Sequence, residues 1–199
     1  MTEASVLIID TGVANIASLL AAFERLGRPA RLTDSVVELG DAAHVVLPGV
    51  GAFRAGMERL TGAGLAEPLR RRIDAGRPTL AVCLGLQLLC EASEESPGVE
   101  GLGVVPARVT RYSDAVRVPQ FGWNEVEPGE GAALLEPGFA YFANSFRIER
   151  LPNGWTGATA DHDGPFVAAL ERDDLLGCQF HPELSGQWGS ALLGRWLQR

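Results

Sequence analysis

The sequence contains few cations, few cysteines and no long apolar run. Its 17 Lys and Arg residues are outnumbered by 25 Asp and Glu, for a formal net charge of −8 at pH 7, so no basic face is available to bind phosphates. We therefore expect neither nucleic acid nor a membrane as a partner. The apolar runs are too short to span a bilayer, and no cationic segment precedes the first one, so we expect no secretory signal.

The three cysteines have no recurrent spacing and do not make a disulfide framework. They fit reduced thiols in a cytoplasmic protein, which is the location we expect. Cys90 and Cys178 stand among apolar neighbours, so we expect them to be buried small side chains, with Cys90 two turns along the helix that follows Cys83. We expect no metal ion and no cofactor.

Apolar runs alternate with helical patterns in the first half of the chain. We predict a parallel strand buried on both faces at 6–10, and further strands at 30–33, 44–47 and 79–82. Helical spacing follows the first run at Ile16, Leu19, Leu20 and Phe23, returns within 53–73, and returns again from Leu84 to about Glu91. This alternation predicts an α/β fold with a doubly wound mixed sheet flanked by helices.

The second half of the chain has a different pattern. Between Gly101 and about Gln179, short β-like runs are separated by Pro, Gly, Asn and Asp, which predicts hairpins and antiparallel strands. A short terminal helix is predicted at 191–197. No repeat, linker or low-complexity tract interrupts the sequence, so we predict a single domain over residues 1–199.

The stretch Ala81–Gly85 (AVCLG) has the spacing of a nucleophile elbow, with Cys83 at the apex of a strand-to-helix turn. A thiol there faces a helix N-terminus, which favours the thiolate. The backbone N–H of Leu84 would point toward a developing oxyanion, and the glycine-rich Pro48–Gly51 (PGVG) after the neighbouring strand is a suitable source of a second donor. Taken alone, however, a free cysteine is more often a buried small hydrophobe.

His181 stands in Gln179–Glu183 (QFHPE), where a strand is predicted to end. Glu183 follows two residues later, beyond a proline, and can orient the imidazole as the third member of a triad. A lone His-Pro-Glu also occurs for purely structural reasons. Its combination with the elbow cysteine and the PGVG stretch is what indicates nucleophilic catalysis. We expect His44 and His162 to be structural or solvated.

Together these motifs resemble the class I (triad) glutamine amidotransferases, and among them the glutaminase subunits of imidazole glycerol phosphate synthase. The resemblance covers nearly the whole chain and rests on six stretches: PGVGAF (48–53), CLGLQLL (83–89), GLG (101–103), VPQFGWNEV (118–126), YFANSF (141–146) and QFHPELSG (179–186). It implies a flavodoxin-like core, and glutamine as the substrate, hydrolysed to glutamate and ammonia through a cysteine thioester.

The resemblance also implies residue roles. Cys83 would attack the carboxamide, His181 would protonate the leaving ammonia and then activate water, and Glu183 would orient His181. The remaining roles are an oxyanion hole formed by Gly49, Val50 and Leu84, and substrate binding by Gly51, Gln87, Asn144, Ser145 and Phe146. Ammonia would pass to a (β/α)₈ synthase subunit in a heterodimer that serves histidine biosynthesis.

The surface that meets such a partner is less well defined by the sequence. Trp123 is either a core or cross-strand aromatic residue or an interface anchor, and both interpretations stay open. Our interface candidates are Asn15, Trp123 and Asn124. The chain departs from the commoner family pattern at several positions, namely the DTGVAN stretch (10–15), Gln120, Asn144 and Leu184. Leu184 lies beside the histidine, so its lack of charge bears on docking.

Other functions stay open at this point. The glutaminase subunit of a different synthase, such as pyridoxal phosphate synthase, would lack the FGWN segment. A stand-alone γ-glutamyl-type cysteine hydrolase would act without a partner and would need a wider substrate groove. A non-catalytic, doubly wound binding module would have no use for Cys83, His181 and Glu183 together.

Overall fold

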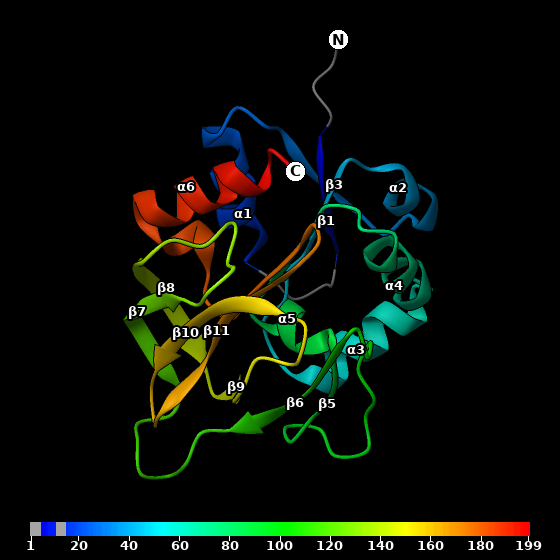
Figure 1. The fold of residues 1–199 in the computed structure, drawn as a ribbon. Coiled ribbons are helices and arrows are strands. Elements are labelled where there is room, and N and C mark those ends of the chain that lie inside the picture. The colour runs from blue at the N-terminus through cyan, green and yellow to red at the C-terminus, as the bar shows by residue number, and fades with distance from the viewer. Residues whose placement is uncertain (1–4, 11–14) are drawn as a thin grey trace.

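The computed structural model describes residues 5–10 and 15–199, so most of the DTGVAN stretch lies outside the described residues. The described residues form a nine-stranded sheet in the order β2-β1-β3-β4-β12-β11-β10-β7-β8 (Figure 1). Its strands are β1 (Val6–Ile9), β2 (Ala30–Thr33), β3 (His44–Leu47), β4 (Thr79–Val82), β7 (Gln120–Pro128), β8 (Gly138–Asn144), β10 (Thr156–Asp161), β11 (Pro165–Arg172) and β12 (Leu175–Cys178). A smaller sheet contains β5 (Cys90–Ser93), β6 (Val105–Arg111) and β9 (Phe146–Ile148).

The large sheet changes character at β12. Neighbouring strands from β2 through β12 are parallel, and those from β12 through β8 are antiparallel. The predicted mixed α/β sheet with an antiparallel second half is therefore confirmed. In the described residues, no helix is long and apolar enough to cross a membrane.

Helices cover both faces of the parallel part (Figure 1). They are α1 (Ile16–Arg25), α2 (Val36–Asp41), α3 (Phe53–Gly62), α4 (Ala66–Asp74), α5 (Leu84–Leu88), the 3₁₀ turn η1 (Pro182–Leu184) and α6 (Gly186–Trp196). The alternation of β1 shows how the layers divide: Val6 and Ile8 pack in the core under α1 and α6, whereas Leu7 and Ile9 pack in the core under α2 to α5.

The helix that follows Cys83 is shorter than predicted. It ends at Leu88, and Cys90 is the first residue of β5, so the prediction that Cys90 continues this helix is wrong. The cause is tertiary: the backbone N–H groups of Leu102 and Gly103 donate to the carbonyls of Leu88 and Cys90, at 2.8 and 3.1 Å. These bonds draw the chain out of the helix and into the smaller sheet.

Three other helical stretches differ from expectation. The stretch predicted within 53–73 forms two helices separated at Gly64, whose φ of +70° is the left-handed conformation that ends a helix. The last helix begins at Gly186 rather than at 191, because the His181–Ser185 turn leads directly into it and the Gly189 N–H donates to the Ser185 carbonyl at 3.0 Å. Helix α2 was not predicted because it has only six residues, although the Ser35 side chain that caps it by accepting the Glu38 N–H was an available signal.

The fold brings three chain segments to one edge. Strands β3, β4 and β12 are adjacent and parallel, so their carboxyl ends meet. PGVG follows β3, Cys83 follows β4, and Gln179 to His181 follow β12. Ligand sites in open α/β sheets lie at such edges.

Candidate active site

Cys83 occupies a strained turn directly after β4. Its φ of 54° and ψ of −111° are values that side-chain-bearing residues avoid, and its N–H donates to the Cys178 carbonyl at 2.7 Å. Two residues on, a Cβ on Gly85 would overlap the Leu47 carbonyl of the adjacent strand. Glycine at 85 therefore lets α5 begin close to β3, and the turn has the geometry of a nucleophile elbow.

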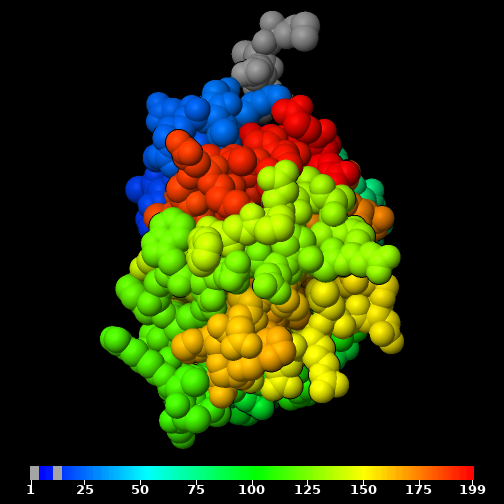
Figure 2. Space-filling model, turned by 60° about the vertical axis from the view of Figure 1, so that its left-hand side comes forward, coloured from blue at the N-terminus to red at the C-terminus, as the bar shows by residue number. Residues whose placement is uncertain are grey.

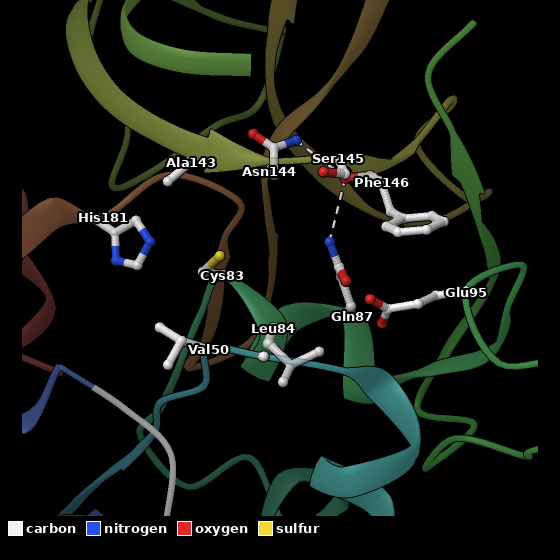
Figure 3. A pocket seen from close by; sticks show the side chains of 11 residues that line it. Val50, Cys83, Leu84, Gln87, Glu95, Ala143, Asn144, Ser145, Phe146 and His181 are labelled. Atoms are coloured by element: carbon white, nitrogen blue, oxygen red, sulfur yellow. Dashed lines mark hydrogen bonds between the residues drawn. The ribbon is translucent and has the colours of Figure 1, made fainter. Parts of the chain in front are cut away.

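His181 lies opposite Cys83 (Figure 3), and Glu183 holds its imidazole. The imidazole Nδ1 lies 2.8 Å from Glu183 Oε1, and both side chains are buried. Burial alone would lower the pKa of His181, but the contacts with Cys83 and Glu183 outweigh it and raise that pKa above its usual range. A protonated imidazole is thus stabilised next to a cysteine sulfur.

The raised pKa predicts how Glu183→Gln changes the pH dependence of glutamine hydrolysis. Removing the carboxylate removes one of the contacts that raise the pKa, so the imidazolium loses its proton at a lower pH. We expect the alkaline limb of kcat/KM against pH to move toward acid by about 1 unit or more. The exposed residue Glu24, on α1, supplies the control Glu24→Gln, and a Glu183→Gln profile that coincides with it would contradict the assignment.

Cys83 and His181 open on a cavity of about 290 Å³, near the lower end of ligand-sized pockets. This volume suits an amino acid better than a peptide. Figure 3 shows Cys83 and His181 on one side of the cavity and Gln87 with Glu95 on the other. Its lining residues are Val50, Gly51, Cys83, Leu84, Gln87, Glu95, Ala143, Asn144, Ser145, Phe146 and His181.

The predicted oxyanion-hole residues meet here, but one of them is already bonded. The Leu84 N–H donates to the Gly49 carbonyl at 3.3 Å. A Cβ on Gly49 would lie 2.9 Å from the Leu84 Cβ, so this close approach requires glycine. Val50 and Gly51 are exposed in the same loop and line the cavity. In this conformation the Leu84 donor faces a backbone carbonyl instead of a substrate.

The predicted substrate-binding residues also surround the cavity. Gln87 is buried, and its Nε2 donates to the Phe146 carbonyl at 3.2 Å. The Asn144 side chain turns away from the cavity, with Nδ2 donating to the Tyr112 hydroxyl and to the same Phe146 carbonyl, at 2.9 and 3.0 Å. Asn144 thus shapes the Ser145–Phe146 segment rather than presenting its amide to a ligand.

Two residues at this site went unnoticed in the sequence. Glu95 lines the cavity, and its Oε2 accepts the Phe53 N–H at the start of α3, at 2.6 Å. Nothing in the acidic segment around it distinguishes Glu95 from its neighbours. Gln179 is wholly buried with its Nε2 3.8 Å from Cys83 Sγ. Residues two apart along an extended strand point to the same face, so the position of Gln179 two residues before His181 was a sequence signal that both side chains point the same way.

The other candidate groups are accounted for by burial. Cys90 and Cys178 are fully buried and unpaired, and burial raises the pKa of both thiols. They behave as the small apolar side chains that we predicted. Within residues 5–10 and 15–199, no group of three or more His, Cys, Asp or Glu side chains is arranged to hold a metal ion.

Exposed aromatic side chains lie beside the cavity on β7 and β8. The exposed fractions of Phe121, Trp123 and Phe139 are 70, 59 and 56%. Tyr141 packs edge-on against Phe121 and Trp123, with ring centroids 5.7 and 6.2 Å apart. We call these four residues the aromatic surface. In Figure 2 the green to yellow-green strands that carry it come forward below the orange-red α6.

The aromatic surface adjoins the candidate catalytic groups. Ala143, the cross-strand partner of Phe121, lines the cavity, and the Tyr141 carbonyl accepts the His181 N–H at 2.9 Å. Trp123 is a cross-strand aromatic residue that is not part of the core. Its ring lies next to Gly186, just after the turn that carries His181.

The two other interface candidates have separate positions. Asn124 Nδ2 donates to the Asp161 carbonyl of β10 at 2.8 Å, so its side chain is turned away from Trp123. Asn15 is exposed at the start of α1.

Comparison with known proteins identifies the family of the chain. The family model of class I glutamine amidotransferases matches residues 7–197. A crystal structure of a glutamine amidotransferase has the same fold, with a TM-score of 0.79 over 98% of both chains at 22% identity. The chain belongs to the class I glutamine amidotransferase family.

Its sequence relatives indicate which branch of this family the chain belongs to. The HisH subunit of imidazole glycerol phosphate synthase from Syntrophotalea carbinolica is 40% identical over 199 residues, which cover 94% of this chain and 97% of that protein. The chloroplastic hisHF protein of Arabidopsis thaliana is 35% identical over 205 residues, covering 98% of this chain and 34% of that protein. Within the family, the chain is a glutaminase subunit of imidazole glycerol phosphate synthase, an enzyme of histidine biosynthesis. This assignment replaces the three alternatives left open by the sequence, namely a subunit of a different synthase, a stand-alone cysteine hydrolase and a non-catalytic binding module.

Proposed function

We propose that the chain acts as a single cytoplasmic domain that hydrolyses glutamine at Cys83 and delivers the ammonia to a (β/α)₈ synthase subunit, with which it forms a heterodimer. The observation that carries the proposal is that Cys83 and the Glu183-bonded His181 meet at one small cavity, although they come from two separate turns of the chain.

In the acylation half of the reaction, Cys83 gives its proton to His181 and the sulfur attacks the carboxamide carbon. Glu183 holds Nδ1, which leaves Nε2 to face the cysteine. The tetrahedral intermediate collapses when the C–N bond breaks and His181 returns the proton to the nitrogen. Ammonia leaves, and a γ-glutamyl thioester remains on the sulfur.

In the deacylation half, water enters and gives a proton to His181 as its oxygen attacks the thioester carbon. The C–S bond then breaks, glutamate is released, and the sulfur regains a proton from His181. Each half therefore uses the same imidazole, first as base and then as acid.

Substrate selection follows from the cavity's far end. Glu95 supplies a carboxylate opposite Cys83, suited to the α-ammonium group of glutamine, while the Ser145–Phe146 backbone faces the same space. A charged group at the end of the cavity opposite Cys83 favours an α-amino acid over a simple amide as the substrate.

Because the Leu84 N–H is already hydrogen-bonded, we expect glutamine hydrolysis by the isolated subunit to be slow. Before an oxyanion can be stabilised, the Gly49 carbonyl must leave that donor. We propose that binding of the synthase subunit favours the rearranged loop, so that ammonia forms only when the partner can accept it.

The aromatic surface is the docking site that fits this role. Apolar rings that are more than half exposed lie next to the cavity, so a partner seated on them would cover the catalytic groups and receive the ammonia. Large aromatic side chains commonly carry most of the binding energy of an interface.

The test combines assembly and activation. Adding the (β/α)₈ subunit with its nucleotide should raise glutaminase activity about tenfold or more, and Trp123→Ala should weaken binding by about 30-fold and abolish the rise at matched concentrations. Val37→Ala is the control, because Val37 is exposed to 74% beside the opposite sheet edge. Full activity of the lone chain, or normal assembly of Trp123→Ala, would contradict the proposal.

A further inference from the structure

The sulfur of Cys83 has a second polar neighbour besides His181. Gln179 Nε2 lies 3.8 Å from Cys83 Sγ, within the range of an N–H···S hydrogen bond, and the Gln179 side chain has no exposed surface. The backbone of Gln179 is also fixed, because its N–H donates to the Ala168 carbonyl at 2.8 Å.

The orientation of the Gln179 amide is determined by its surroundings. Gln87 Nε2 donates to Gln179 Oε1 at 3.0 Å and to the Phe146 carbonyl at 3.2 Å. An NH₂ group donates two hydrogen bonds, and both acceptors are oxygens. Rotating the Gln179 amide by 180° would bring two NH₂ groups together, so its own NH₂ must point at the sulfur.

Further bonds hold this arrangement from the other side. The Phe146 carbonyl also accepts Asn144 Nδ2, which donates to the Tyr112 hydroxyl as well. That hydroxyl in turn donates to Gln120 Oε1 at 3.1 Å, and Gln120 is the cross-strand partner of Asn144. Every side chain in the chain of bonds is buried, so the Gln179 amide has no alternative partner in solvent.

We propose that Gln179 is the second hydrogen-bond donor to the reactive sulfur, holding it as a thiolate before acylation and again when the thioester C–S bond breaks. The proposal rests on the function proposed above. His181 is protonated at both of these stages and is the first donor, but it also transfers its proton, to ammonia in the first half of the reaction and to the sulfur in the second. Gln179 carries no charge and transfers no proton, so it stays bonded to the sulfur at every stage.

The test measures the rate at which iodoacetamide alkylates Cys83 as a function of pH, with peptide mapping to identify the modified cysteine. Gln179→Met has a similar size and no N–H donor, so we expect the midpoint of the profile to rise by about 1 unit or more. The matched control is Tyr112→Phe, which removes a buried hydroxyl from the same chain of bonds, beyond Gln87 and Asn144, and should leave the midpoint near wild type.

A Gln179→Met midpoint no higher than that of Tyr112→Phe would overturn the proposal. If Gln179→Met does not fold, Gln179→Asn supplies the same comparison, because its shorter side chain withdraws the amide from the sulfur. Alkylation does not depend on turnover. An absence of glutaminase activity in the wild-type complex would therefore count against the proposed function, while the alkylation profile would still test Gln179.

Discussion

Replacing Cys83 by alanine should reduce glutamine hydrolysis on the order of 10⁴-fold or more, measured as glutamate release by the complex with the synthase subunit. The reason is that the thioester has no other nucleophile to form on. Synthase activity supplied with free ammonia should persist, because the partner site is untouched. The variant should also assemble normally, since the side chain removed is small and lies at a cavity.

The chain provides its own controls for this experiment. Cys90→Ala and Cys178→Ala make the same change at two fully buried cysteines outside the cavity, and both should keep hydrolysis close to wild type. Cys83 would be removed from the mechanism if Cys83→Ala kept glutamine hydrolysis near the wild-type rate. The same conclusion would follow if only the two control variants lost hydrolysis.

Gly85→Ala should be among the most damaging single-methyl additions in this protein. The new Cβ would overlap the Leu47 carbonyl, and backbone on both sides leaves little room to move. We expect a loss of about 3 kcal/mol or more in the free energy of unfolding, measured by urea denaturation. We also expect glutamine hydrolysis to be lost in any fraction that folds, because the strain falls on the turn that positions the nucleophile.

The matched control for this prediction is Gly194→Ala. Gly194 also lies in a helix, α6, but a Cβ built there meets nothing within 4 Å. Alanine should therefore stabilise the protein by about 0.5–1 kcal/mol, because it restricts the unfolded chain. Equal effects of the two substitutions would show that helix propensity, not the contact between α5 and β3, determines the result.

The local motifs of this site were predictable from sequence because each depends on a few neighbouring residues. The elbow needs a strand, a nucleophile and a glycine in series, and the His181–Glu183 pair lies within a single turn. The fold class was predictable for a similar reason, since strand and helix periods alternate along the chain. Burial on both faces makes the parallel strands continuously apolar.

The features that sequence did not predict depend on distant parts of the chain. Helix α5 stops at Leu88 because backbone donors more than ten residues away bind its end. The role of Asn144 follows from Tyr112, and the exposure of Trp123 follows from which face of the β7–β8 pair is left uncovered. Alternation along a strand tells which residues share a face, but not which face meets solvent.

The backbone conformation of Cys83 would mislead any screen for improved variants that selects on melting temperature alone. A φ of 54° with a ψ of −111° is open to glycine, whereas a cysteine held there raises the energy of the folded state by about 1–3 kcal/mol. Cys83→Gly would relieve that strain and delete the sulfur in one step. Such a screen would rank an inert protein above the enzyme, so improvement of this scaffold has to be selected on turnover.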